Sequence, residues 1–297
     1  MTDSTNNFLT LKAYAKVNLA LDVLRKREDG YHDVKMIMQN LDIYDELEFE
    51  VLARDTEDTR ITLSVNKPGI PTDQRNLVNK AIALLFEEFN IKSHINVNLI
   101  KNIPAEAGMA GGSTDCAAAL KAVNALYDLG LTTEELMKRG VCLGADVPYC
   151  VLGKTSISEG IGEVLTPIKG LPNCHVLVAK PPVNVSTKEI YTNLKANELK
   201  EHPDVDGMVE ALEGGNLQGI TERMSNVLET VTVNMHPEIE ELKALMKEMG
   251  ALNAIMSGSG PTVFGIFDDK DKVWDCAMVI GDRELAPEVF ITRPVNA

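Results

Sequence analysis

The sequence predicts an α+β fold in two lobes, built from mixed or antiparallel sheets with helices. Segments in which apolar and polar residues alternate, as in strands, are interspersed with segments of helical spacing. The chain has 297 residues, which is enough for two modest domains with separate cores. The character of the sequence changes near residues 165–172. We therefore predict an N-terminal domain over residues 1–166 and a C-terminal domain over residues 167–297.

The first domain is predicted to combine strands with three helices. Alternation predicts strands over residues 9–24, 43–52, 60–65 and 94–100. Apolar spacing predicts helices over residues 75–89, over 113–129, and from the Thr132-x-x-Glu135 capping box to near Gly140 or Gly144. Asn76 or Asp73 can cap the first of these helices. A glycine-punctuated hairpin is predicted over residues 153–168.

The second domain is predicted to contain more helix than strand. Its predicted strands follow the same alternation rule and cover residues 175–183, the strand–turn–strand segment 253–267, and residues 288–293. Its predicted helices cover a short segment opened by Ser186-x-x-Glu189, then residues 205–213, 216–229, 236–249 and 270–280. His236-Pro237 places a proline near the first position of the fourth helix.

Composition excludes several classes of function. A formal net charge of −15 is unsuited to a broad nucleic-acid surface, so an anion must be held by a local site. The N-terminal MTDSTNNF has neither the basic nor the apolar region of a signal peptide, and no apolar run reaches the roughly 18 residues of a membrane span. The five cysteines lack CxxC spacing and predict reduced core thiols. We expect a cytoplasmic protein.

The segment IPAEAGMAGGSTDCAAAL, residues 103–120, is a glycine-rich loop that leads into a helix of small residues. The N–H groups and positive dipole end of such a helix can hold a phosphate, and glycines allow the backbone to approach it. The loop lacks the lysine of a Walker A motif, and its glycines do not form GxGxxG. Two interpretations remain at this point, a phosphate-binding loop and a close-packing turn before a buried helix.

Three further stretches carry chemistry only if they act together with this loop. AYAKVNLALDV places Lys16 and Asn18 on one face of a strand, GADVPYC carries Asp146 just past a helix, and MSGSGPT at 256–262 is a second glycine turn. Each has an ordinary structural explanation by itself, namely a solvated strand lysine, a helix-end cap and a hairpin turn.

Taken together and in this order, these motifs resemble the GHMP kinase superfamily of small-molecule kinases. PAEAGMAGGST resembles the second family motif, AKVNLALDV the first and SGSGPTVFGIF the third. DGYH beside AKVN, with LGADVPYC and EGIGE, resembles the members that act on a cytidine diphosphate-linked methylerythritol. The resemblance implies a two-lobed fold with the active site between the lobes. It also implies ATP-dependent phosphorylation of the 2-hydroxyl of that substrate, in the non-mevalonate isoprenoid precursor pathway.

The resemblance assigns roles to residues of this chain. It implies that Asp146 is the general base and Lys16 its charged partner. The implied ATP-binding residues are Pro104, Ala105, Glu106, Ala107, Gly108, Met109, Ala110, Gly111, Gly112, Ser113 and Thr114, with Asn76 and Lys101 near the adenine. The implied acceptor-binding residues are Asn18, Tyr31, His32 and Tyr191, the tyrosines stacking on cytosine from different lobes.

The family pattern leaves the metal ligands unassigned. Mg²⁺ is expected as a cofactor with ATP, but Gly111 and Gly112 stand where several relatives have serines that help to hold it. Glu106 and Ala110 stand where many relatives have glycine, and we expect the Glu106 carboxylate to point away from the triphosphate. The only expected partner is the small-molecule substrate, without nucleic acid, membrane or an obligate protein partner.

Alternatives from other classes are a homoserine or mevalonate-type kinase, a non-catalytic binding protein of this fold, and a nicotinamide-dependent oxidoreductase. DGYH argues against the first, and the presence of both Lys16 and Asp146 argues against the second. The glycine spacing of the loop argues against the third.

Overall fold

The computed structural model describes residues 7–296 of the chain. Most of the N-terminal segment used to argue against a signal peptide lies outside these residues. The chain forms two compact units that interleave along the sequence. Unit 1 contains the chain up to Ala15, Tyr44–Ile103 and Ala110–Leu152. Unit 2 contains Lys16–Ile43, Pro104–Met109 and the chain from Gly153 onward.

The sheet of unit 1 has the strand order β3-β4-β2-β1. Its strands are β1 (Phe8–Lys26), β2 (His32–Arg54), β3 (Arg60–Val65) and β4 (Ser93–Ile100). β2 pairs with β4 in antiparallel register and β3 pairs with β4 in parallel register. In β4, Ser93, Ile95, Val97 and Leu99 alternate as buried residues with more exposed ones, so one face of the sheet is apolar.

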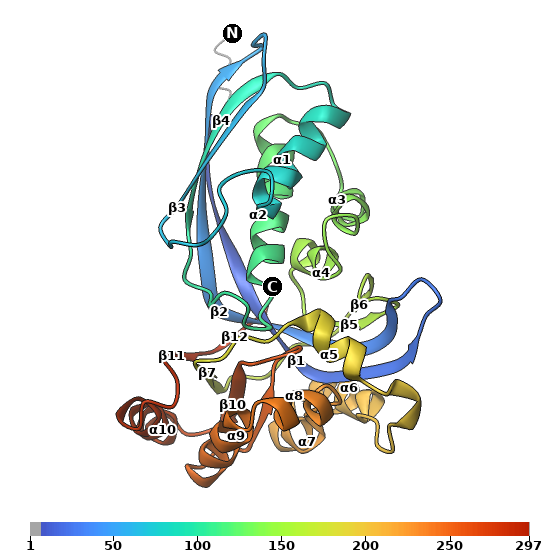
Figure 1. Cartoon of the computed structure of the whole chain (residues 1–297), viewed down its shortest axis with the longest axis vertical. Helices are drawn as coiled ribbons and strands as arrows, with labels where there is room; N and C mark the ends of the chain where they lie inside the picture. The colour runs from blue at the N-terminus through green and yellow to red at the C-terminus, as the bar shows by residue number, and fades with distance from the viewer. Residues whose placement is uncertain (1–6, 297) are drawn as a thin grey trace. The chain divides into compact units, whose positions relative to one another are not determined.

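Helices cover this apolar face (Figure 1). They are α1 (Leu77–Glu88), α2 (Gly111–Leu126), α3 (Thr133–Gly140) and α4 (Val147–Leu152). α2 is buried along most of its length, including the run Cys116–Leu120. Its alanines let α2 pack closely between its neighbours, with Phe49, Leu85 and Val123 in the same core.

Unit 2 contains a second, antiparallel sheet with the order β11-β7-β10-β9. Its strands are β7 (His175–Lys180), β9 (Asn253–Met256), β10 (Val263–Phe267) and β11 (Glu288–Thr292). The helices of this unit are α5 (Thr187–Asn193), α6 (Val205–Glu213), α7 (Leu217–Arg223), α8 (Glu229–Met235), α9 (Glu238–Glu248) and α10 (Lys270–Asp282). A short 3₁₀ turn covers Ala196–Glu198.

Several short strands pair, directly or through one another, with the parts of β1 and β2 that belong to unit 2. These are β5 (Ser156–Glu159), β6 (Val164–Pro167), β8 (Ser225–Asn226) and β12 (Pro294–Val295). β5 and β12 pair with β2, β6 pairs with β5, and β8 runs parallel to β1. β1 and β2 are thus long enough to contribute to both units, and their connecting turn belongs to unit 2.

Most predicted elements are present close to their predicted bounds, which confirms the α+β class. β2 begins at His32, well before the strand predicted over residues 43–52, and α4 was not predicted. The helix predicted over residues 216–229 is instead α7, β8 and then α8. Asn226 explains this break. Its side chain donates to the carbonyls of Met256 and Gly258, at 2.8 Å each, and its Oδ1 accepts from the backbone of Leu228. These tertiary contacts override the local helical spacing.

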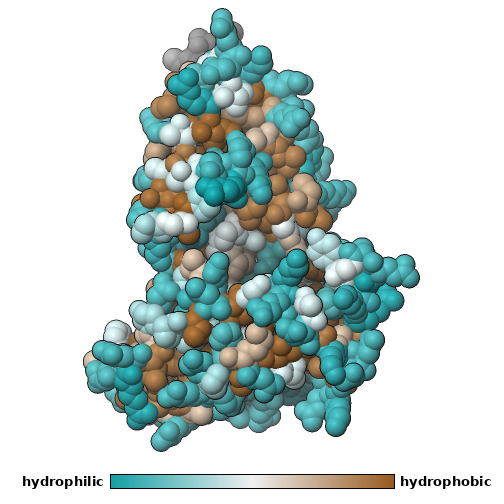
Figure 2. Space-filling view, in the orientation of Figure 1, coloured by the Kyte–Doolittle hydropathy of each residue, from teal (hydrophilic) through white to brown (hydrophobic). Residues whose placement is uncertain are grey.

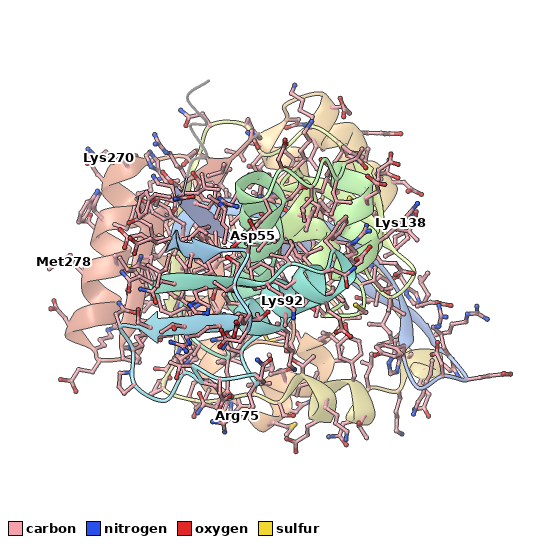
Figure 3. All side chains as sticks on the ribbon, turned by 90° about the horizontal axis from the view of Figure 1, so that it is seen from above. Asp55, Arg75, Lys92, Lys138, Lys270 and Met278 are labelled. Atoms are coloured by element: carbon pink, nitrogen blue, oxygen red, sulfur yellow. The ribbon has the colours of Figure 1, made fainter. Side chains whose placement is uncertain are left out.

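The visible surface is largely hydrophilic, with apolar residues between the charged ones (Figure 2). On α10, Lys270 and Met278 project from the helix (Figure 3), and Met278 and Trp274 are exposed. No helix within residues 7–296 is long and apolar enough to cross a membrane. The five cysteines are free, with Cys116, Cys174 and Cys276 buried as predicted but Cys142 exposed.

Candidate active site

The glycine-rich loop between β4 and α2 has an unusual backbone. Glu106, Gly108 and Ala110 all have left-handed conformations, with φ of 51°, 68° and 58°. Repeated left-handed residues in a loop turn successive N–H groups toward a common side, which creates a concave site for an anion. Ala110 is the N-cap of α2 and makes no side-chain cap hydrogen bond. The first amides of α2 therefore receive no side-chain cap from Ala110, and the helix dipole adds positive potential at this end of the helix.

Gly108 is needed because the loop packs against the second glycine turn. A Cβ at Gly108 would lie 2.2 Å from the carbonyl oxygen of Ser257 and 3.1 Å from that of Gly260. The Ser257 hydroxyl donates to the Gly108 carbonyl at 3.0 Å. The turn between β9 and β10 is thus both a hairpin turn, as its sequence suggests, and a support for the loop.

Lys16 of β1 reaches the same point of the loop. Its Nζ donates to Asn18 Oδ1 at 2.8 Å and to the Gly108 carbonyl at 3.3 Å, and its backbone N–H donates to the Met109 carbonyl. Both side chains are buried, with Lys16 only 4% exposed. The interpretation of Lys16 as a solvated strand lysine is therefore wrong. A buried ammonium with two polar acceptors is placed beside the predicted phosphate-binding backbone.

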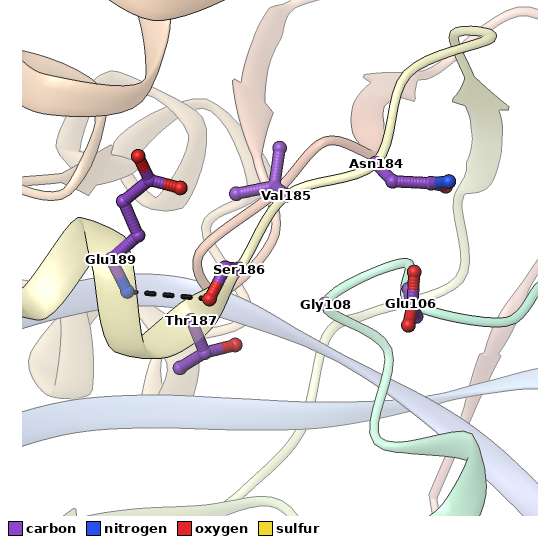
Figure 4. A pocket seen from close by; sticks show the side chains of 8 residues that line it. Glu106, Gly108, Asn184, Val185, Ser186, Thr187 and Glu189 are labelled. Carbon is purple, nitrogen blue, oxygen red and sulfur yellow. Dashed lines mark hydrogen bonds between the residues drawn. The ribbon is translucent and has the colours of Figure 1, made fainter.

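A cavity of about 510 Å³ opens beside Gly108 (Figure 4). It is lined by Glu106, Gly108, Asn184, Val185, Ser186, Thr187, Glu189 and Gly260. The Ser186 hydroxyl accepts from the backbone of Glu189 at the start of α5, and the hydroxyls of Thr187 and Ser259 are 2.8 Å apart. The volume and the mixture of hydroxyl, amide and carboxylate groups suit a polar small molecule. Glu106 lines this cavity and is exposed, so the expectation that its carboxylate points away from the triphosphate stays a prediction.

Two of the three residues predicted to recognise the base lie together. The rings of His32 and Tyr191 have centroids 5.1 Å apart at an interplanar angle of 44°. His32 is buried, and burial, with a smaller contribution from Lys26, lowers the pKa of its imidazole, so the ring is neutral near pH 7. Tyr31 is 58% exposed, and its backbone N–H donates to Asp29 in the β1–β2 turn. The prediction that the two tyrosines come from different lobes is wrong, because the long β1 and β2 carry their turn into unit 2, where Tyr31 and Tyr191 both lie.

Asp146 and Asn76 both lie at helix starts. Asp146 directly precedes α4, is half-buried, and accepts from the Cys150 backbone through its carbonyl at 3.1 Å. Its pairing with Lys16 stays a prediction. Asn76 caps α1, its Oδ1 accepting from Val78 and its amide donating to the Pro71 carbonyl. The capping role is confirmed, and the adenine contact stays a prediction.

Lys101 is buried between two carboxylates that the sequence analysis did not single out. Its Nζ forms ion pairs with Asp45 and, at 2.7 Å, with Asp115. A signal for Asp45 was present, because it occupies a position of β2 between buried Ile43 and Leu47 on the apolar face. The side chain of Lys101 points into unit 1, so any contact with adenine would involve its backbone.

The site fits a nucleotide better than it fits a preformed metal cage. The left-handed residues and the open start of α2 suit phosphate oxygens. Within residues 7–296, no group of three or more His, Cys, Asp or Glu side chains could hold a metal ion. Mg²⁺ in kinases usually keeps waters and binds through one or two protein groups plus the phosphates, so the two observations agree.

Comparisons with known proteins agree with this geometry. The model of the GHMP kinase N-terminal domain matches residues 76–154, and that of the GHMP kinase C-terminal domain matches residues 208–275. A crystal structure of a 4-(cytidine 5'-diphospho)-2C-methyl-D-erythritol kinase matches with a TM-score of 0.82 and 29% identity, over 97% of this chain and all of that one. A homoserine kinase from Cytophaga hutchinsonii, at 20% identity and a TM-score of 0.78 over 100% of this chain and 98% of its own, shares the fold.

Curated relatives narrow the family. A 4-diphosphocytidyl-2-C-methyl-D-erythritol kinase from Lachnoclostridium phytofermentans is 52% identical over 264 residues, 89% of each chain. One from Clostridium perfringens is 45% identical over 289 residues, which is 97% of this chain and 99% of the relative. Identity at this level over nearly the whole length shows the family directly. The chain belongs to the 4-diphosphocytidyl-2-C-methyl-D-erythritol kinases, a branch of the GHMP kinases.

Proposed function

We propose that this protein transfers the γ-phosphoryl group of ATP to the 2-hydroxyl of 4-diphosphocytidyl-2-C-methyl-D-erythritol, in the non-mevalonate route to isoprenoid precursors. The observation that carries the proposal is the contact of buried Lys16 with the Gly108 carbonyl of the loop. This contact joins the first and second motifs that distinguish these kinases. Membership of the family supplies the substrate.

ATP is proposed to bind through the loop 104–114. The amides around Glu106, Gly108 and Ala110 and the start of α2 would hold the phosphates, as helix N-termini do in other nucleotide sites. Mg²⁺, when bound with ATP, supplies positive charge to the phosphates. No protein ligand is assigned to it. The neutralising charge therefore does not need a lysine inside the loop.

Asp146 is proposed to accept the proton of the acceptor hydroxyl, and Lys16 to stabilise the transferred phosphoryl group. An ionised carboxylate is a weak base for an alcohol, so the proton moves late in the transfer. An ammonium near the reacting oxygens lowers the energy of the transition state more than that of the bound substrates. Lys16 is well suited, because Asn18 and Gly108 hold its Nζ in place.

The cytidine end of the acceptor is proposed to bind at His32 and Tyr191, with Tyr31 at the outer side and Asn18 near the erythritol end. The aromatic pair already in contact offers a stacking surface, and the neutral imidazole of His32 can bond the edge of a pyrimidine. We further propose a cytoplasmic location and no obligate protein partner.

A panel of alcohols with Mg-ATP, scored for ADP release, tests the proposal. The cytidine diphosphate-linked methylerythritol should be turned over at least about 100-fold more efficiently than mevalonate or homoserine. These two alcohols carry no base, so they would leave the cytidine site empty. Equal turnover of all three alcohols would contradict the substrate, and ADP release from none would contradict the kinase activity.

A further inference from the structure

A buried cluster of one lysine and two aspartates lies at the start of α2. Lys101 follows the end of β4, Asp45 lies on β2, and Asp115 lies in the first turns of α2. The Nζ of Lys101 pairs with both carboxylates, and all three side chains are at most 6% exposed. Such an arrangement costs desolvation energy, so its stabilising value alone does not explain it.

The cluster ties together the two ends of the glycine-rich loop. Asp45 Oδ1 accepts from the backbone N–H of Asn102 at 2.6 Å and from that of Ile103 at 2.8 Å, the residues that lead into the loop. Asp115 lies one turn into the helix that leaves it. Through Lys101, Asp45 is therefore joined to both the entrance and the exit of the loop.

The ammonium lies directly behind the first residue of α2. A Cβ at Gly111 would lie 3.2 Å from Lys101 Nζ and 3.2 Å from Cγ2 of Ile103. Any larger residue at this position would push against the cluster. This contact explains the glycine at 111, and it places the cluster immediately against the start of α2.

The cluster is neutral only if one carboxyl holds a proton. Burial raises the pKa of Asp115 to about 8, the nearby Lys101 ammonium opposing this rise and Asp45 adding to it. Asp115 Oδ1 is buried and has no hydrogen-bond partner within residues 7–296. A second buried negative charge would also oppose phosphate binding at the start of α2.

We propose that Asp45, Lys101 and Asp115 form a brace that positions the start of α2 for ATP, with Lys101 acting as a positioning residue rather than as a ligand of the nucleotide. The inference rests on the proposed function, because it takes the loop to be the ATP site. It differs from a merely structural role in one respect. Loss of the brace should change the affinity for ATP more than the turnover rate or the acceptor affinity.

The test measures binding of a non-hydrolysable ATP analogue by calorimetry, alongside steady-state kinetics and melting temperature. Lys101→Met and Asp115→Ala should each weaken analogue binding at least about tenfold, since small displacements of a binding group are costly. kcat and the KM for the acceptor should change less than about threefold. Asp115→Asn, unlike Asp115→Ala, should bind the analogue as the wild type does near pH 7, because the amide has the shape of the protonated carboxyl.

Lys121→Met is the matched control. Lys121 of α2 is a half-buried lysine whose Nζ donates to the Cys150 carbonyl and lies outside the cluster. Its analogue affinity should equal that of the wild type. If Lys101→Met fails to fold, the two Asp115 variants still decide. Analogue affinity within about threefold of wild type in Asp115→Ala, with only its melting temperature lowered, would overturn the brace.

The binding assay separates this inference from the proposed function. Wild-type protein that binds the ATP analogue but phosphorylates no cytidine-bearing acceptor would remove the proposed substrate and leave the brace testable. Wild-type protein that turns over the acceptor, with Lys101→Met unaffected in analogue affinity, would remove the brace and leave the function intact.

Discussion

Lys16 shows how much the role of one residue depends on its surroundings. On β1 its neighbours in sequence suggest ordinary alternation, yet its ammonium is buried and bound to Asn18 and to the loop carbonyl of Gly108. Taken by itself, the sequence around Lys16 favours a solvated strand lysine, and only the family resemblance predicts a catalytic one. The burial of Lys16 comes from the pairing of distant segments, which is not encoded in local spacing.

Lys16→Met should lower kcat at least about 100-fold and change the KM for ATP little, because the charge matters most as the transition state forms. Steady-state kinetics in ATP measures both values. Lys12→Met, an exposed lysine on the same strand, is the control and should behave as wild type. A variant of Lys16 that loses only ATP affinity would make Lys16 a ground-state phosphate ligand instead.

Asp146→Asn should also lower kcat at least about 100-fold, the usual scale for loss of a positioned base, while nucleotide binding is retained. Because Asp146 directly precedes α4, melting temperature must be measured in parallel to separate a capping effect from a catalytic one. Turnover within a few-fold of wild type would exclude Asp146 from the mechanism.

The buried carboxyl of Asp115 makes the unfolding free energy of the protein depend on pH. Its folded pKa of about 8 lies above its ordinary value of 3.8, so the folded chain binds the extra proton between these values. The stability supplied by this group is therefore complete below about pH 4 and is lost as the pH rises to about 8. Its charged neighbours are Lys101 and Asp45, while burial keeps the Cys116 thiol neutral by raising its pKa to about 12.

Urea unfolding of wild type and Asp115→Asn at about pH 5, 7 and 9 tests this linkage. The advantage of wild type over the variant should shrink steadily as the pH rises, because the asparagine does not titrate. A difference in unfolding free energy that is constant over this range would show that Asp115 is ionised throughout.

At the scale of elements, the backbone of the glycine-rich loop is strained. Ala110 adopts φ of 58°, a conformation that costs an L-residue about 1–2 kcal/mol and a branched residue more. Ala110→Val should therefore lower the unfolding free energy by at least about 1 kcal/mol as well as weaken ATP binding. Ala110→Gly is the control and should stay within about 1 kcal/mol of wild type. Chemical denaturation without ligand measures the unfolding free energy of both variants. An Ala110→Val variant as stable as the wild type would contradict the left-handed conformation of Ala110.

α5 carries Tyr191 to His32, the aromatic pair proposed to bind the base. Base stacking on an aromatic side chain is worth about 1–3 kcal/mol, so Tyr191→Ala should weaken the cytidine-bearing acceptor about 5- to 150-fold. Tyr191→Phe should bind it as wild type does, and ATP affinity should not change in either. Titration with cytidine diphosphate measures the effect, and unaltered affinity in Tyr191→Ala would place the base elsewhere.

Elements with strong local signals were predictable from the sequence. β3 and α6 have their predicted bounds, and the predicted capping box is present, with Thr132 accepting from Glu135 and the Glu135 carboxylate accepting in return. Elements fixed by tertiary contact were not. β12 consists of two residues that are strands only because they pair with β2.

At the scale of the whole molecule, the sequence indicated two parts but not how the chain divides between them. Contiguous domains at 1–166 and 167–297 are the simplest expectation, and the two family models lie on either side of that boundary. The compact units instead interleave, because β1 and β2 extend through both. The alternation of apolar and polar residues along a strand looks the same in either unit. It therefore does not show that one strand continues from the first unit into the second.

The central claim is the identity of the reaction, and phosphorus NMR of the products tests it most directly. After incubation of 4-diphosphocytidyl-2-C-methyl-D-erythritol with Mg-ATP and the wild-type protein, one new phosphomonoester signal should appear, with phosphorus–carbon coupling to carbon 2. One ADP should form per ester, and the cytidine diphosphate linkage should stay intact. A phosphoryl group on another hydroxyl, or ADP formed without any ester, would contradict the account.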